Sequence, residues 1–255
     1  LALLSDAGHN LSDVISLVLA LLAFRMAKVK PNSRYTYGYK KSTVLVSLLN
    51  AIILLVAVGI ILAESIEKLR NPQPIAGGVI AWVAGVGILI NAFTAFLFLK
   101  DKERDLNIKG AYLHLMADAL VSVGVVISGV IISYTHWYII DPIIGIAIAI
   151  VILVSTWNLL RDSLRLSLDG VPAGISAEKI RKLLLQVDGV REIHHLHIWA
   201  LSTTQNALTA HVVVASLEDG EAVKNRIKEI LSEEHIPHAT LELETVAECC
   251  TDRTD

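Results

Sequence analysis

Residues 111–134 read AYLHLMADALVSVGVVISGVIISY, a run long and apolar enough to cross a bilayer that nevertheless carries two ionisable side chains. A membrane span needs about 20 predominantly apolar residues. His114 and Asp118 lie four positions apart, so a helix places both side chains on one face. An ionisable group at bilayer depth is costly and persists mainly where it pairs, binds an ion or carries protons. The stretch therefore predicts a transmembrane helix with a functional polar pair.

The same spacing occurs near the start of the chain. Residues 5–24, SDAGHNLSDVISLVLALLAF, contain His9 and Asp13. Two such helix faces turned together supply two imidazoles and two carboxylates, a four-ligand set suited to tetrahedral Zn²⁺. Hydrogen bonding between packed helices is the alternative role, but it explains one intramembrane histidine better than two identical pairs. The quartet predicts a site that moves a metal ion across a membrane.

Charge balance links this metal to protons. Two carboxylates and two neutral imidazoles total minus two, which one divalent cation neutralises. Once emptied, the site would hold two close anions in a low dielectric, so protons should bind there. Metal and protons then compete for the same atoms. We expect an exchange of Zn²⁺ against H⁺.

Composition supports a membrane protein. The 255 residues are 54% hydrophobic and only 18% charged, against about 25% charged in soluble domains, and mean hydropathy is +0.59. The net charge of −3 gives no reason to expect a nucleic-acid partner. Five apolar segments are long enough to span the bilayer: 2–24, 43–62, 77–99, 111–134 and 143–160. Asn50 and Asn91 lie within two of them, and we expect both to form interhelical hydrogen bonds.

Loop charges predict the orientation. The loops after the first and third segments are basic, whereas the loop at 135–141 has no Lys or Arg. The positive-inside rule places the basic loops and the C-terminal part in the cytoplasm. An odd number of spans leaves Leu1 outside, so we expect one further span before it and six in the full-length protein.

The depth of the polar quartet leaves two arrangements open. His114 follows Lys109 by five residues, near the inner membrane edge, whereas His9 precedes Arg25 by sixteen. Facing pairs should lie at equal depth. Either the first helix projects into the cytoplasm, or the site opens into an inner vestibule.

After Asp162 the sequence becomes that of a soluble domain. Residues 176–187 and 219–234 have helical patterns, with Ser176 as an N-cap, and residues 190–201, 207–215 and 238–245 have strand patterns. The order α-β-β-α-β predicts a small ferredoxin-like α+β fold. We therefore expect a transmembrane domain over 1–165 and a cytoplasmic domain over 166–255.

Histidines gather in this second domain. His194, His195 and His197 share one predicted strand, and simple alternation puts His195 and His197 on one face and His194 on the other. His211 lies on the next strand and His238 begins the last. Glu244 ends that last strand, and Cys249 and Cys250 follow it. Such a combination of His, Cys and carboxylate side chains is typical of a metal site. Surface histidines and a frayed tail are the alternative.

The chain resembles the cation diffusion facilitator family, in its zinc-transporting branch. The resemblance rests on SDAGHNLSD, RYTYGYKK, HLMADAL, DGVP and DGVREIHHLHIWAL running on to AHVVV. It implies that His9, Asp13, His114 and Asp118 form the transport site, that His197, His211 and His238 bind metal, and that the protein is a homodimer joined through its cytoplasmic domains. Glu244, Cys249 and Cys250 resemble the acid and tail cysteines of that branch.

We therefore predict a non-enzymatic, proton-coupled Zn²⁺ antiporter, with a regulatory cytoplasmic zinc site, in a bacterial inner membrane. A membrane-anchored metal sensor without transport is the main alternative, but it leaves the membrane carboxylates unexplained. An intramembrane metalloenzyme would need a general base beside its ligands, as in H-E-x-x-H. The sequence contains no such motif.

Overall fold

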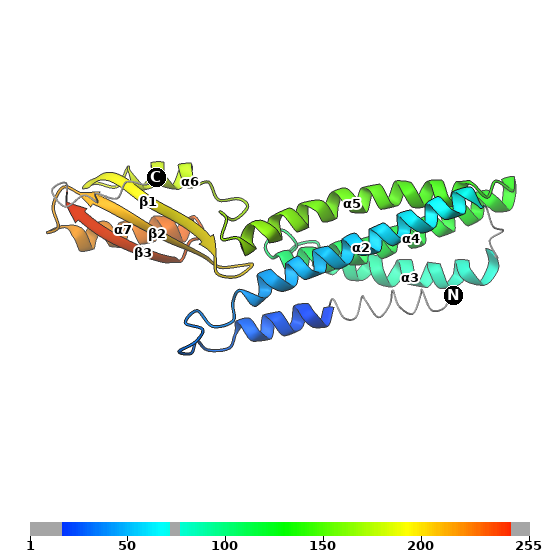
Figure 1. Ribbon diagram of the computed structural model, residues 1–255, viewed down its shortest axis with the longest axis horizontal. Coiled ribbons are helices and arrows are strands. Elements are labelled where there is room, and N and C mark those ends of the chain that lie inside the picture. The colour runs from blue at the N-terminus through cyan, green and yellow to red at the C-terminus, as the bar shows by residue number, and fades with distance from the viewer. Residues whose placement is uncertain (1–16, 72–76, 246–255) are drawn as a thin grey trace. The chain divides into compact units, whose positions relative to one another are not determined.

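The computed structural model describes residues 17–71 and 77–245. Contacts divide the chain into two compact units: one comprises Leu1–Val29 and Ser42–Ser163, the other Lys30–Lys41 and Leu164–Asp255. The first unit is helical and the second combines helices with a sheet (Figure 1).

Long apolar helices form the first unit. They are α2 (Ser42–Arg70), α3 (Gly77–Phe98), α4 (Leu106–Thr135) and α5 (Ile140–Ser167), and a helical segment over Leu17–Ala27 precedes them. In the described residues, α2, α4 and α5 are each long and apolar enough to cross a membrane. Asp105 caps α4 by accepting a hydrogen bond from the Asn107 backbone N–H. These helices confirm the predicted multi-span helical domain.

The interior of the unit lies between α2, α4 and α5. Val58, Ala117, Ala149 and Ile152 form one buried cluster there. Small residues let the helices approach closely, as is usual in membranes. A methyl group added at Gly124 of α4 would lie 2.5 Å from Ile148 Cδ1 of α5.

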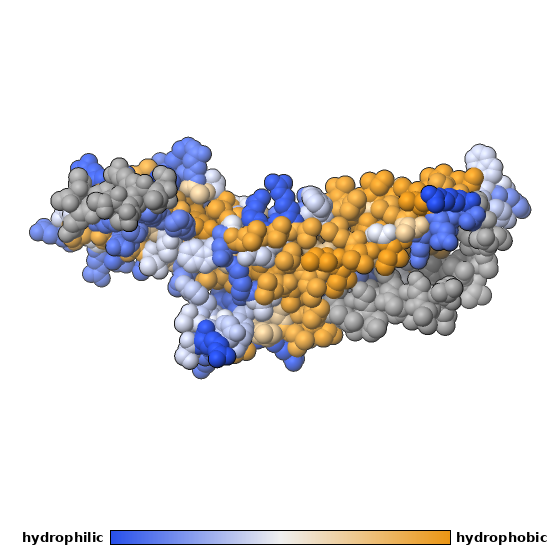
Figure 2. Space-filling view, in the orientation of Figure 1, coloured by the Kyte–Doolittle hydropathy of each residue, from blue (hydrophilic) through white to orange (hydrophobic). Residues whose placement is uncertain are grey.

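Apolar side chains also cover the outside of this unit (Figure 2). On α2 the exposed residues recur every three or four positions along one face, whereas the polar residues Ser47 and Asn50 are buried on the other. The exposed set on α2 includes Leu45, Leu49, Ile52, Val56 and Ile60. Such an extended apolar surface requires a membrane or a partner to cover it.

The second unit has the predicted order α-β-β-α-β. Its elements are α6 (Ala177–Leu184), β1 (Val190–Ala200), β2 (Asn206–Val214), α7 (Gly220–Glu233) and β3 (His238–Thr245). The sheet order is β1-β2-β3, with β1 antiparallel and β3 parallel to β2. Apolar residues of both helices, including Ile180 and Ile227, pack against alternate residues of the strands, such as Leu208 and Val212. This packing confirms the α+β expectation and leaves the side chains of Thr209 and His211 on the other face.

Local signals in the sequence explain the helix and turn boundaries. The Ser176 side chain accepts a hydrogen bond from the Lys179 backbone N–H, so the predicted N-cap is confirmed. Gly189, between α6 and β1, has φ +92°, a conformation that favours glycine. The loop Lys30–Lys41 packs within this unit, where Lys41 contacts the Asp169 carboxylate and donates to the Ala200 carbonyl at 3.0 Å.

Candidate metal sites

The first candidate site is the predicted polar pair on α4. His114 Nε2 lies 3.9 Å from Asp118 Oδ2, and the two side chains are only 7% and 11% exposed. Both face the interior between α2, α4 and α5, because a small cavity there is lined by both of them together with Val58 of α2 and Ile152 of α5. The helical spacing thus places the pair on the buried face of α4, as predicted from its sequence.

The predicted partners of this pair, His9 and Asp13, lie outside the described residues. So does Asp6. The four-ligand arrangement therefore remains a prediction, and the described half of it is a buried imidazole beside a buried carboxylate.

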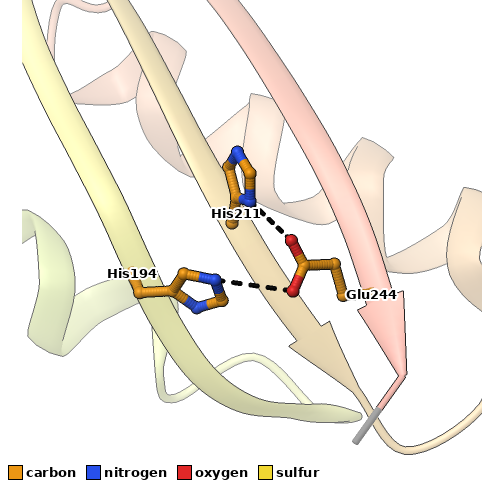
Figure 3. A group of neighbouring side chains, drawn as sticks. All are labelled: His194, His211 and Glu244. Carbon is orange, nitrogen blue, oxygen red and sulfur yellow. Dashed lines mark hydrogen bonds and ion pairs between the residues drawn. The ribbon is translucent and has the colours of Figure 1, made fainter. Parts of the chain in front are cut away.

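The second candidate site lies on the sheet. Within residues 17–71 and 77–245, one group of His, Cys, Asp or Glu has ligand atoms close enough to hold a metal ion: His194 on β1, His211 on β2 and Glu244 on β3 (Figure 3). One ligand atom from each lies within 4.8 Å of the others. Glu244 stands between the two imidazoles, with Oε1 at 2.5 Å from His211 Nδ1 and Oε2 at 3.4 Å from His194 Nε2.

A metal ion fits the chemistry of this group. His194 is 8% exposed, and neither of its ring nitrogens has a hydrogen-bond partner within residues 17–71 and 77–245. The 3.4 Å contact with Glu244 is an ion-pair distance that does not satisfy hydrogen-bond geometry. Tetrahedral Zn²⁺ holds nitrogen and oxygen ligands roughly 3.4 Å from one another. Two imidazoles and one carboxylate would leave its fourth position for water or a further side chain.

A β-bulge in β1 brings His194 to this face. His194 pairs with His211 and His197 pairs with Thr209, so two residues of β1 stand opposite one residue of β2. His195 lies within the bulge and has φ +47°, a left-handed conformation that is uncommon for a residue with a side chain. Simple alternation therefore fails here: His194 and His197 share a face.

The structure groups only part of the predicted cytoplasmic ligand set. His211 and Glu244 belong to the described group, whereas His197 and His238 are not members of it. The His238 ring instead packs edge-on against Tyr37, with ring centroids 5.5 Å apart. Cys249 and Cys250 lie outside the described residues.

Sequence reasoning missed His194 as a ligand candidate. The period-2 rule assigned it to the opposite face, because nothing in the residue pattern specifies where the extra residue of a bulge falls. A run of three histidines within four positions was the available signal, since it offers a ligand on either face of the strand.

A bundle of apolar helices with a buried His/Asp pair, followed by a small α/β domain with a His/His/Glu group, defines a membrane protein that handles metal cations. The sequence profile described as "Cation efflux transmembrane domain" matches residues 1–166, and that described as "Cation efflux protein, cytoplasmic domain" matches residues 172–246. The chain therefore belongs to the cation efflux family, a family of transporters. It is an integral membrane protein whose C-terminal domain is cytoplasmic, and the predicted family is confirmed.

Bacterial relatives cover almost the whole chain. The zinc transporter ZitB of Pectobacterium atrosepticum is 40% identical over 96% of this chain and 77% of its own length. The cadmium, cobalt and zinc/H(+)-K(+) antiporter of Bacillus subtilis is 36% identical over 97% of this chain and 81% of its own. A solved structure, the metal-bound C-terminal domain of the CzcD transporter of Cupriavidus metallidurans, is 32% identical, covers 28% of this chain and 99% of its own, and has a TM-score of 0.26.

Proposed function

We propose that the protein exports Zn²⁺ from the cytoplasm in exchange for protons, through a membrane site formed by His9, Asp13, His114 and Asp118. The observation that carries this proposal is the buried His114–Asp118 pair in an apolar helix that is long enough to span the bilayer. A carboxylate so placed needs a cation or a proton to balance it. The names of the zinc-transporting relatives support zinc as the cargo.

In the proposed mechanism, Zn²⁺ and protons compete for the same nitrogen and oxygen atoms of the membrane site. Cytoplasmic Zn²⁺ binds the deprotonated side chains, and its charge balances the two carboxylates. Protons arriving from outside then occupy the same nitrogens and oxygens, so the metal leaves on that side. Imidazole and carboxylate together suit Zn²⁺, Cd²⁺ and Co²⁺ better than Mn²⁺, which favours an all-oxygen site.

In this proposal the two domains have different roles. Residues 1–165 carry the transport site in a bacterial inner membrane. Residues 166–255 form a cytoplasmic metal-binding domain that joins two copies into a homodimer, and the description of the matching profile as the cytoplasmic domain of a cation efflux protein supports its location. Zinc held by His194, His211 and Glu244 would bias the dimer toward one arrangement. The other predicted ligands, His197, His238, Cys249 and Cys250, stay candidates for completing that site.

Zinc flux tests the transport proposal. The full-length protein is reconstituted into proteoliposomes with a zinc dye, with and without a pH gradient, and compared with Asp118→Ala, Asp13→Ala and the control Glu103→Ala in an exposed loop. We expect gradient-dependent flux in wild type and control, and none in the other two variants. Flux retained by Asp118→Ala contradicts the site, whereas flux that ignores the gradient contradicts proton coupling.

A metal sensor without transport is the second candidate function. The His194/His211/Glu244 group favours it, because that group needs no membrane site in order to bind metal. Zinc that binds the purified protein but never crosses the proteoliposome membrane would support the sensor.

A further inference from the structure

Asn50 lies in the membrane helix α2, and its amide oxygen is an unusual buried polar atom. The residue is 5% exposed, and its Oδ1 is buried without a hydrogen-bond partner among the described residues. Among the described residues, this oxygen therefore does not make the interhelical hydrogen bond expected from the sequence. A buried polar atom is normally paired, and an unpaired one in a native fold indicates a ligand, a water or a catalytic role.

The cavity beside Asn50 shows what the oxygen can reach. Asn50 and His114 line the same small cavity of about 10 Å³, together with Leu17, Leu54, Gly110 and Ala111. That volume is about the room needed by one water-sized particle. His114 and Leu54 also line the neighbouring cavity that contains Asp118. His114 thus borders two neighbouring cavities, one lined also by Asn50 and the other lined also by Asp118.

The packing of α2 against α4 holds Asn50 at this level. Near the start of the two helices, Asn107 Nδ2 donates to the Thr43 carbonyl at 3.0 Å. Asn50 follows Thr43 by seven residues and His114 follows Asn107 by seven, so both advance about 10 Å along their helices. Gly110 of α4 lies beside Asn50, because a methyl group added there would be in ordinary van der Waals contact with the Asn50 Cβ at 3.8 Å.

We infer that Asn50 is a further cation-positioning residue, whose amide oxygen contacts the divalent cation at His114 directly or through one water. This inference rests on the proposed transport site. The amide oxygen supplies one further ligand atom for that cation. Oxygen is a harder ligand than imidazole nitrogen, so Asn50 also favours Zn²⁺ over the softer Cd²⁺.

Asn50→Leu is the variant that tests this role, because leucine has nearly the same size and lacks the amide. Asn50→Ala removes both the amide and its bulk, and Asn50→Asp restores an oxygen. The control Asn91→Leu removes an amide of α3 that does not line this cavity. Flux of Zn²⁺ and of Cd²⁺ is measured in proteoliposomes for each. We expect Asn50→Leu and Asn50→Ala to raise KM for Zn²⁺ by about 10-fold, with a smaller change for Cd²⁺. Asn50→Asp should recover the preference for Zn²⁺, and Asn91→Leu should retain it.

Two results overturn the inference. One is an unchanged KM and Zn²⁺/Cd²⁺ ratio in both Asn50→Leu and Asn50→Ala while Asp118→Ala is inactive; the transport site then stands and Asn50 only fills space. The other is an equal loss for both metals that Asn50→Asp does not reverse, which indicates a packing role. Flux retained by Asp118→Ala is a separate result that removes the transport site, and the inference with it.

Discussion

Two buried residues, His194 and Asn50, have polar atoms that suit them to bind a metal ion. His194 in the sheet and Asn50 in the bundle are both buried, and in the described part of the chain both His194 ring nitrogens and the Asn50 Oδ1 have no hydrogen-bond partner. Leaving a buried polar group unpaired costs roughly 1–3 kcal/mol. In the two proposals above, a bound ion supplies the missing interaction.

Replacing His194 should weaken the cytoplasmic site more than replacing His197. Zinc titration is carried out on full-length protein carrying Asp118→Ala, so that the membrane site does not contribute. We expect His194→Ala to lower the affinity by at least about 10-fold, because it removes one of the three grouped ligands. His197→Ala, on the same face but outside that group, should lower the affinity less than His194→Ala does. The reverse order of effects would contradict the site on the sheet.

At the scale of elements, the sequence predicts what depends on periodicity and composition. The buried face of α4, the cap at Ser176 and the order of the strands all follow from local patterns. The bulge at His195 does not, because its position is set by the pairing of β1 with β2 rather than by either strand alone. That one extra residue reverses the face of His194, and so decides which histidine joins the site.

The close packing of α4 on α5 predicts that a large side chain at Gly124 destabilises the protein. Gly124→Leu should lower the thermal midpoint by about 3–10 °C, from an overpacking cost of about 1–3 kcal/mol, because even a methyl group there would lie 2.5 Å from Ile148 and 3.0 Å from Ile144. Gly129→Leu on the same helix is the matched control, since an added Cβ there meets no described atom within 4 Å. Size-exclusion chromatography of heated, detergent-solubilised protein gives both midpoints. Equal midpoints would show that the two helices can separate at Gly124 without loss.

In the whole molecule, each unit contains its own candidate metal site. The membrane unit buries His114 and Asp118 among apolar helices, where a carboxylate needs a cation or a proton to balance its charge. The sheet site combines Glu244 with histidines from two neighbouring strands, so metal binding there ties three strands together. A site of the first kind suits transport, and one of the second kind suits regulation, because bound metal favours the arrangement that presents all of its ligands.

Disabling the sheet site should therefore change how transport responds to zinc without stopping it. We expect His211→Ala to keep the maximal rate and to raise the cytoplasmic zinc concentration for half-maximal flux by about 5-fold or more, the usual size of coupling between two sites. His235→Asn is the control: it removes an exposed histidine and keeps a residue that tolerates the φ of +63° found there. Flux is measured in proteoliposomes across a range of zinc concentrations. If His211→Ala falls to the level of Asp118→Ala, the sheet histidines belong to the transport path itself; if its curve overlays wild type, the site has no part in regulation.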